Sequence, residues 1–154
     1  MAKRKQSFDA PAEAAAASLR YIESSALLAA LLEQDAAAMQ DLRALGQRVT
    51  SALTFSEAAR ALIRARVTGR ITPNQERQAL RALRTFERRI AVVALTSDIL
   101  VRAGRPFPAE PVRTFDAVHL ATVELLGEPP QLVTIVTRDE RVRANARALG
   151  YMVT

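Results

Sequence analysis

Short apolar segments of strand length alternate with helical patterns along most of this chain of 154 residues. Ile90–Leu95 and Leu132–Thr137 are nearly continuous aliphatic runs, which is the pattern of strands that are buried on both faces. Strands that alternate with helices predict an α/β fold, in which helices cover both faces of a parallel sheet. In such sheets the functional residues collect beyond the carboxyl ends of the strands.

The boundaries of these elements follow from periodicity and from capping residues. Strands are expected over Leu19–Glu23, Ile90–Leu95, Leu132–Thr137 and Tyr151–Val153, with extended chain over Val49–Thr54. Helices are expected over Ala26–Leu32, Ala36–Leu45, Ser56–Thr68, Pro73–Arg89, Ser97–Ala103, Thr114–Leu126 and Glu140–Leu149. Ser25 and Thr72 are the predicted N-caps of the first and fourth of these helices. Residues 1–18, basic and then rich in alanine, are expected to be a flexible extension before a single domain over residues 19–154.

The composition favours an anionic partner. The chain carries 22 basic and 16 acidic residues, a net charge of +6, and 20 of the basic residues are arginine. Arginine's forked guanidinium suits phosphate, which favours a nucleic acid, although a solvated basic surface explains the composition equally well. The absence of cysteine excludes disulfides and thiolate metal sites and is typical of a cytoplasmic protein. No apolar run reaches the roughly 20 residues of a membrane span.

Four acidic residues lie where the predicted sheet would place its functional edge. Glu23 closes the first strand, and Asp139 follows the strand over Leu132–Thr137 by two residues. Asp116 and Glu57 fall in the first turns of two predicted helices. If the strands are parallel neighbours, these carboxylates converge at one edge of the sheet.

Helix capping is the simpler explanation for three of these acids when each is taken alone. Thr54 and Glu57 match a capping box, as do Thr137 and Glu140. Asp139 and Asp116 both lie near helix N-termini, where the helix dipole favours a negative charge. Glu23 differs from them, because it precedes the predicted cap Ser25.

Carboxylates that converge repel one another unless a cation neutralises them. Oxygen ligands without cysteine select a hard divalent ion, Mg²⁺ or Mn²⁺, which can activate water and stabilise charge on a phosphodiester. His119 lies one helical turn after Asp116. A packed histidine that supports the pocket is the preferred interpretation of His119, and a general base or metal ligand is the alternative.

Four blocks of the sequence resemble PIN domains. Among PIN domains they are most similar to the VapC toxins of bacterial toxin–antitoxin pairs. The blocks are YIESSALL (21–28), SALTFSEAAR (51–60), RTFDAVHLAT (113–122) and VTRDERV (136–142). The resemblance implies a three-layer α/β/α fold with a central five-stranded parallel sheet. It also implies an Mg²⁺- or Mn²⁺-dependent endoribonuclease that cuts tRNA or ribosomal RNA, is inhibited by a cognate antitoxin and forms a homodimer.

The resemblance also assigns roles to individual residues. It implies that the catalytic and metal-binding quartet is Glu23, Glu57, Asp116 and Asp139. Ser25 and Thr137 match the supporting polar positions. Glu23 departs from the family pattern, which usually has aspartate there, so the metal geometry at this position is open. The arginines beside the acids are candidate contacts to RNA phosphates, with surface solvation as the alternative; they are Arg113, Arg138 and Arg141.

Two other functions fit parts of the pattern. Glu23 in place of aspartate would suit a non-catalytic PIN-like module that binds RNA. The basic composition would also suit a DNA-binding regulator, although no helix-turn-helix spacing accounts for the strands.

Overall fold

The computed structural model describes residues 18–154, so all but the last residue of the predicted N-terminal extension lies outside the described residues. A five-stranded sheet, parallel throughout, has the strand order β3-β2-β1-β4-β5. The strands are β1 (Leu19–Ile22), β2 (Gln47–Ser51), β3 (Ala91–Val93), β4 (Val133–Val136) and β5 (Met152–Val153). The predicted parallel α/β sheet is confirmed.

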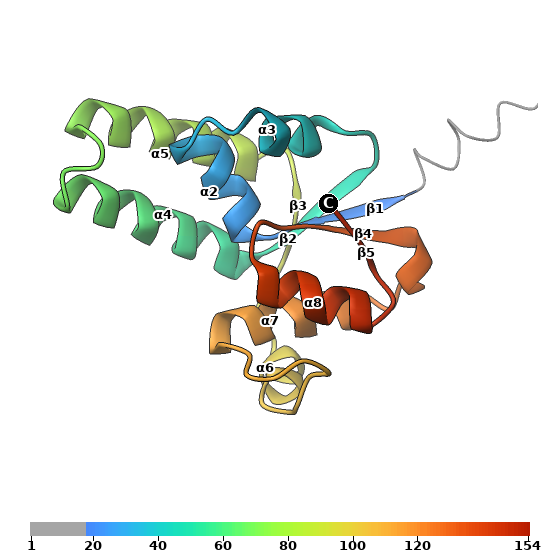
Figure 1. The fold of residues 1–154 in the computed structure, drawn as a ribbon. Coiled ribbons are helices and arrows are strands. Elements are labelled where there is room, and N and C mark those ends of the chain that lie inside the picture. Colours follow the sequence, from blue (N-terminus) through green and yellow to red (C-terminus); the bar gives the residue numbers. More distant parts are fainter. Residues whose placement is uncertain (1–17) are drawn as a thin grey trace, which may run out of the picture.

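Helices cover both faces of the sheet and complete three layers, with α2, α3, α4 and α5 on one side and α6, α7 and α8 on the other (Figure 1). The first group comprises α2 (Ser24–Leu32), α3 (Ala36–Arg43), α4 (Ala52–Val67) and α5 (Pro73–Glu87). The second comprises α6 (Ser97–Ala103), α7 (Thr114–Glu124) and α8 (Glu140–Ala148), and a 3-10 turn, η1 (Pro130–Leu132), precedes β4. No helix among residues 18–154 is long and apolar enough to cross a membrane.

Alternation along β1 and β4 divides the core into two clusters. Tyr21 and Ile135 pack in the cluster under α6, α7 and α8. Their neighbours Ile22 and Val136 pack in the cluster under α2, α3, α4 and α5. Because successive strand residues point to opposite faces, each central strand contributes to both clusters.

The two aliphatic runs, both predicted to be buried strands, differ in how far they are buried in the structure. All four residues of β4 are buried, as predicted for Leu132–Thr137. The prediction of a strand buried on both faces is wrong for Ile90–Leu95, because β3 pairs only with β2 at the edge of the sheet. Val92 and Leu95 are each 43% exposed.

Helix starts were predicted correctly for α3, α5, α6, α7 and α8 and were displaced for α2 and α4. Thr72 caps α5 in a full capping box, with its hydroxyl accepting from the Gln75 amide at 3.2 Å. Three N-caps differ from the prediction: they are Glu23 for α2, Ser51 for α4 and Asp139 for α8. The predicted cap at Ser25 and the capping boxes at Thr54 and Thr137 are therefore wrong. Glu57 consequently lies in the second turn of α4, not the first.

The central pair of strands positions the site. β1 pairs with β4 on one side, with Ile22 opposite Val136. On its other side β1 pairs with β2, the next strand along the chain. The order of the strands thus reverses between β1 and β4, and the crevice beyond their carboxyl ends is where such sheets bind ligands.

Candidate active site

Glu23 occupies the first position after β1 and is 3% exposed. Its Oε1 accepts hydrogen bonds from the Ser24 hydroxyl at 2.6 Å and the Ser25 amide at 3.1 Å. Its Oε2 accepts from the hydroxyls of Ser25 and Thr137, the latter at 2.8 Å. Four donors therefore satisfy a carboxylate that would otherwise be costly to bury. Capping, which the sequence argument excluded for Glu23, accounts for one of these bonds.

Ser25 and Thr137, the two expected supporting residues, join the start of α2 to the end of β4. The Ser25 hydroxyl accepts from the Arg138 amide at 2.7 Å, and the Thr137 hydroxyl accepts from the Asp139 amide at 3.0 Å. The two side-chain oxygens lie 3.2 Å apart. These bonds hold the loop that carries Asp139 against the loop that carries Glu23.

Asp139 and Asp116 begin two helices at the same edge of the sheet. Asp139 Oδ1 caps α8 by accepting from the amides of Arg141 and Val142, at 2.8 and 3.2 Å. Asp116 lies in the first turn of α7, and its Oδ2 is buried without a hydrogen-bond partner among residues 18–154. Burial, and then the charges of Asp139 and Glu23, raise the pKa of Asp116. Asp139 and Glu23 therefore act on Asp116 as like charges.

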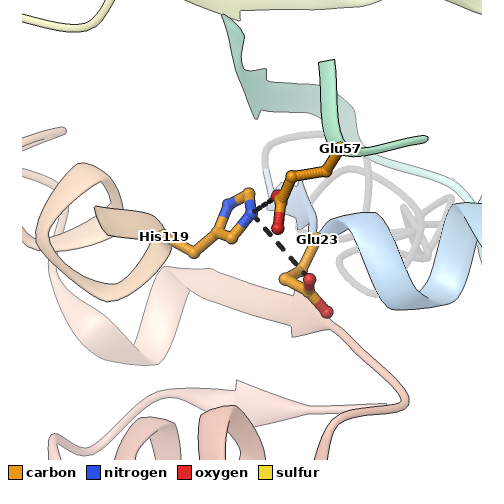
Figure 2. A group of neighbouring side chains, drawn as sticks. All are labelled: Glu23, Glu57 and His119. Atoms are coloured by element: carbon orange, nitrogen blue, oxygen red, sulfur yellow. Dashed lines mark hydrogen bonds and ion pairs between the residues drawn. The ribbon is translucent and has the colours of Figure 1, made fainter. Parts of the chain in front are cut away.

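Glu57 and His119 meet across the crevice, and Figure 2 shows the imidazole facing the carboxylates of Glu57 and Glu23. His119 Nε2 lies 2.6 Å from Glu57 Oε2 and 3.9 Å from Glu23 Oε1. Potential ligand atoms of these three residues lie within 4.8 Å of one another, the one such group among residues 18–154. Asp116 and Asp139 are outside this group, so the structure brings the four acids to one crevice without closing them into one tight set.

Tyr21 lies behind the histidine. Its hydroxyl oxygen is 2.8 Å from His119 Nδ1, and the two rings meet edge to face. Burial, and then the charge of Glu23, raise the pKa of Tyr21. The sequence analysis did not single out Tyr21 or Ser24. A tyrosine in an otherwise aliphatic strand is a usable signal, because its buried hydroxyl requires a partner.

The three candidate RNA-contact arginines have different surroundings. Arg113 and Arg141 are exposed at the N-termini of α7 and α8. Arg138 is partly buried, and its Nη2 lies 2.9 Å from Asp41 Oδ2 on α3. Arg138 is therefore engaged within the protein, whereas the other two side chains face solvent.

A groove of about 710 Å³ between α2 and α4 leads away from the acids. At the crevice it is lined by Ser24, Glu57 and the exposed ring of Phe115. Farther along, its walls are mainly apolar, with Arg60 and Arg64 spaced one helical turn apart on α4.

Solved structures with this fold include a toxin–antitoxin complex and two other proteins. VapBC-1 from nontypeable Haemophilus influenzae matches with a TM-score of 0.55 at 14% identity, covering 88% of this chain and 96% of that one. A toxin–antitoxin complex from Klebsiella pneumoniae has a TM-score of 0.55 at 22% identity, covering 81% and 90%. PAE2754 from Pyrobaculum aerophilum has a TM-score of 0.57 at 21% identity, covering 90% and 86%. At these identities the likeness concerns the fold.

Sequence comparison is more specific. Ribonuclease VapC46 of Mycobacterium tuberculosis is 35% identical over 135 residues, which cover 86% of this chain and 94% of that protein. Ribonuclease VapC35 of the same organism is 33% identical over 138 residues, covering 86% and 93%. The family model described as the PIN domain matches residues 20–148. The chain therefore belongs to the PIN domain family.

Proposed function

We propose that the protein is a metal-dependent endoribonuclease and the toxin of a toxin–antitoxin pair. The observation that carries this proposal is the buried Asp116 Oδ2, which has no hydrogen-bond partner among residues 18–154. The negative charges of Asp139 and Glu23 also raise the pKa of this carboxyl group. A fold that holds like charges together in this way is suited to a cation at that place. The relatives named as ribonucleases support RNA as the substrate.

The donor set fits a hard divalent ion. The four acids Glu23, Glu57, Asp116 and Asp139 would supply carboxylate oxygens, which suit Mg²⁺ or Mn²⁺. When bound, such an ion lowers the pKa of water and stabilises negative charge on a phosphodiester. Glu23 is already oriented by Ser24, Ser25 and Thr137, so its direction does not depend on the ion.

The remaining residues bind and orient the substrate in this proposal. Glu57 Oε2 is held by His119, which leaves Oε1 to orient the attacking water. Arg113 and Arg141 project at the rim, where their guanidinium groups would contact the RNA phosphates on either side of the scissile bond. Structured RNA such as tRNA or ribosomal RNA is the substrate class that we expect.

The groove between α2 and α4 supports the second part of the proposal. We expect the cognate antitoxin to lay an apolar segment in this groove and to extend its end into the acidic crevice, because the groove is open, mainly apolar and continuous with Glu57. We also expect the toxin to form a homodimer, which light scattering of the isolated protein would measure.

Cleavage of a structured RNA in the presence of Mn²⁺ tests the enzyme. We expect cleavage by the wild type, its loss in EDTA and its loss in Asp116→Asn. Glu128→Gln is a matched control, because Glu128 is exposed in the turn before β4. This turn lies at the amino ends of the strands, whereas the four acids lie at their carboxyl ends.

Two outcomes would contradict the proposal. Cleavage that survives Asp116→Asn would remove the assigned site. RNA binding without cleavage at any Mn²⁺ concentration would indicate the non-catalytic module, and metal-independent binding to duplex DNA would indicate the regulator.

A further inference from the structure

His119 lies at the centre of the candidate site with a polar contact at each ring nitrogen. Its side chain is 1% exposed, Nε2 lies 2.6 Å from Glu57 Oε2, and Nδ1 lies 2.8 Å from the Tyr21 hydroxyl oxygen. Figure 2 shows one ring nitrogen facing the carboxylates of both Glu57 and Glu23. A buried imidazole that has a protein partner at both nitrogens is fixed in orientation.

The partners determine where the proton of the ring lies. An ionised carboxylate only accepts hydrogen bonds, so Nε2 must carry the hydrogen that it donates to Glu57. In the neutral ring Nδ1 is then the acceptor, and the Tyr21 hydroxyl donates to it. If the ring carries a second proton, Nδ1 donates to the Tyr21 oxygen and Nε2 still donates to Glu57. In both states Nε2 has no lone pair for an ion, although its position beside Glu23 and Glu57 resembles that of a ligand.

Glu57 is the residue on which this arrangement acts. Glu57 lies in the second turn of α4, and its side chain is 18% exposed. His119 holds Oε2, whereas Oε1 makes no hydrogen bond within residues 18–154. A glutamate side chain samples several rotamers when it is free. The hydrogen bond from His119 selects the one that faces Glu23 across the crevice.

We propose that Tyr21 and His119 form a positioning relay that orients the Glu57 carboxylate toward the acidic crevice, with His119 as a hydrogen-bond donor and not as a metal ligand. The proposal deepens the proposed function and rests on it for the role of Glu57 in cleavage. Tyr21 and His119 are positioning residues in this scheme, because both act through Glu57.

The proton assignment is tested first, without any cleavage assay. His119 is the only histidine in the sequence, so a long-range ¹H–¹⁵N spectrum of tag-free protein shows one imidazole and needs no assignment. We expect Nε2 to carry the proton that it donates to Glu57. A ring protonated only at Nδ1, or one that averages between the two tautomers, would overturn the relay.

The role in cleavage is tested with a double-mutant cycle. Tyr21→Phe removes one hydroxyl, and His119→Gln keeps an amide donor in a more flexible side chain. We expect each to lower kcat by about 10- to 100-fold with little change in KM, the range for residues that orient a catalytic group. In a Glu57→Gln background neither should lower kcat further, because the group on which they act is gone. Effects that multiply in that background would contradict the relay.

Electron spin echo spectroscopy of the Mn²⁺-loaded protein separates a donor from a ligand. A nitrogen coupling to Mn²⁺ that disappears in His119→Gln would show that His119 binds the ion, and the relay would be wrong. Tyr151→Phe is the matched control for Tyr21→Phe, since Tyr151 is a buried tyrosine of the same core and makes no hydrogen bond to Glu57 or His119.

Failure of the relay and failure of the proposed function give different results. If the wild type neither cleaves RNA nor binds Mn²⁺, the proposed function is wrong. The tautomer of His119 then still shows whether His119 donates its hydrogen bond to Glu57. If His119→Gln does not fold, Tyr21→Phe carries the kinetic cycle alone.

Discussion

Thr137 Oγ1 donates a 2.8 Å hydrogen bond to Glu23 Oε2 and so joins two residues that are 114 positions apart in the chain. The same hydroxyl accepts from the Asp139 amide at 3.0 Å. One side chain at the end of β4 therefore orients the carboxylate at the end of β1 and holds the backbone of a second acid.

Thr137→Val tests this double role with a side chain of nearly the same shape. The variant leaves Glu23 without one of its four donors and the Asp139 amide without its acceptor. We expect Mn²⁺ affinity, measured by calorimetry, to fall by about 10- to 100-fold, as for other residues that orient metal ligands. Thr85→Val is the control, because the Thr85 hydroxyl bonds only within the exposed end of α5, donating to the Arg81 carbonyl and accepting from the Arg88 guanidinium. Unchanged Mn²⁺ affinity in Thr137→Val would show that Glu23 needs no orientation by β4.

Asp116→Asn is expected to stabilise the metal-free protein at neutral pH. The pKa of Asp116 is raised in the folded protein, by burial first and then by Asp139 and Glu23. Its contribution to stability is therefore fully present below the ordinary value of 3.8 and is lost as the pH rises through the raised value. At pH 7 the ionised carboxylate destabilises the fold, and the amide removes that charge.

Thermal unfolding in EDTA as a function of pH measures this effect. We expect a higher melting temperature for Asp116→Asn at pH 7 and a difference that shrinks as the pH falls. For a chain of this size each kcal/mol corresponds to about 2–4 °C. A lower melting temperature for the variant at pH 7 would mean that Asp116 is compensated within the protein and needs no cation.

Addition of a divalent ion should reverse the order of stability. A ligand that binds only the folded state at about 100 times its Kd stabilises that state by about 2.7 kcal/mol. We expect Mn²⁺ to raise the melting temperature of the wild type accordingly and to leave Asp116→Asn unchanged. An equal shift in both proteins would place the ion elsewhere.

The architecture was predictable from the sequence because it depends on patterns that repeat along the chain. The aliphatic run that ends at Thr137 and the helices around it specify a parallel sheet, and the sheet brings the strand ends together. The edge position of β3 was not predictable, because an aliphatic run does not show whether a second strand or helix covers it. Periodicity predicts that a segment is a strand or a helix, but it does not predict which other elements pack against that segment.

Helix starts and the contacts around His119 depend on information that local patterns lack. Glu23 and Ser25, like Ser51 and Thr54, are alternative caps within a few residues of each other, and the strand end decides between them. The contact between His119 and Glu57 spans 62 positions, and no spacing in the sequence indicates it. Convergence of the acids was foreseen from the sheet, whereas the histidine's partner required the folded chain.

Asn145 holds the loop that leads to Asp116. Its side chain is fully buried, accepts from the Ala109 amide at 2.8 Å and donates to the carbonyls of Ala109 and Arg141, each at 3.0 Å. Asn145→Ala leaves backbone groups of the loop without partners, at a cost of about 1–3 kcal/mol for each buried group. We expect a lower denaturation midpoint and faster proteolysis within residues 105–113. Asn74→Ala, in the exposed first turn of α5, is the control, and equal midpoints for both variants would contradict the role of Asn145.

The surroundings of the three arginines predict that they contribute unequally to RNA binding. Arg113 and Arg141 are exposed, whereas Arg138 is paired with Asp41. Each phosphate contact on a single strand adds about 0.7 to the slope of log affinity against log salt concentration. We expect Arg113→Gln and Arg141→Gln each to weaken binding of RNA in EDTA and to lower that slope by about one contact.

Arg138→Gln should behave differently, because its guanidinium is held by α3. We expect it to lower the melting temperature through loss of the Asp41 pair, with little change in the salt slope. Arg88→Gln, at the exposed C-cap of α5, controls for net charge alone. A slope that falls equally in all four variants would mean that RNA responds to the overall charge of the protein. Such a result would remove Arg113 and Arg141 from the site, because position beside the acids is the property that separates them from Arg88.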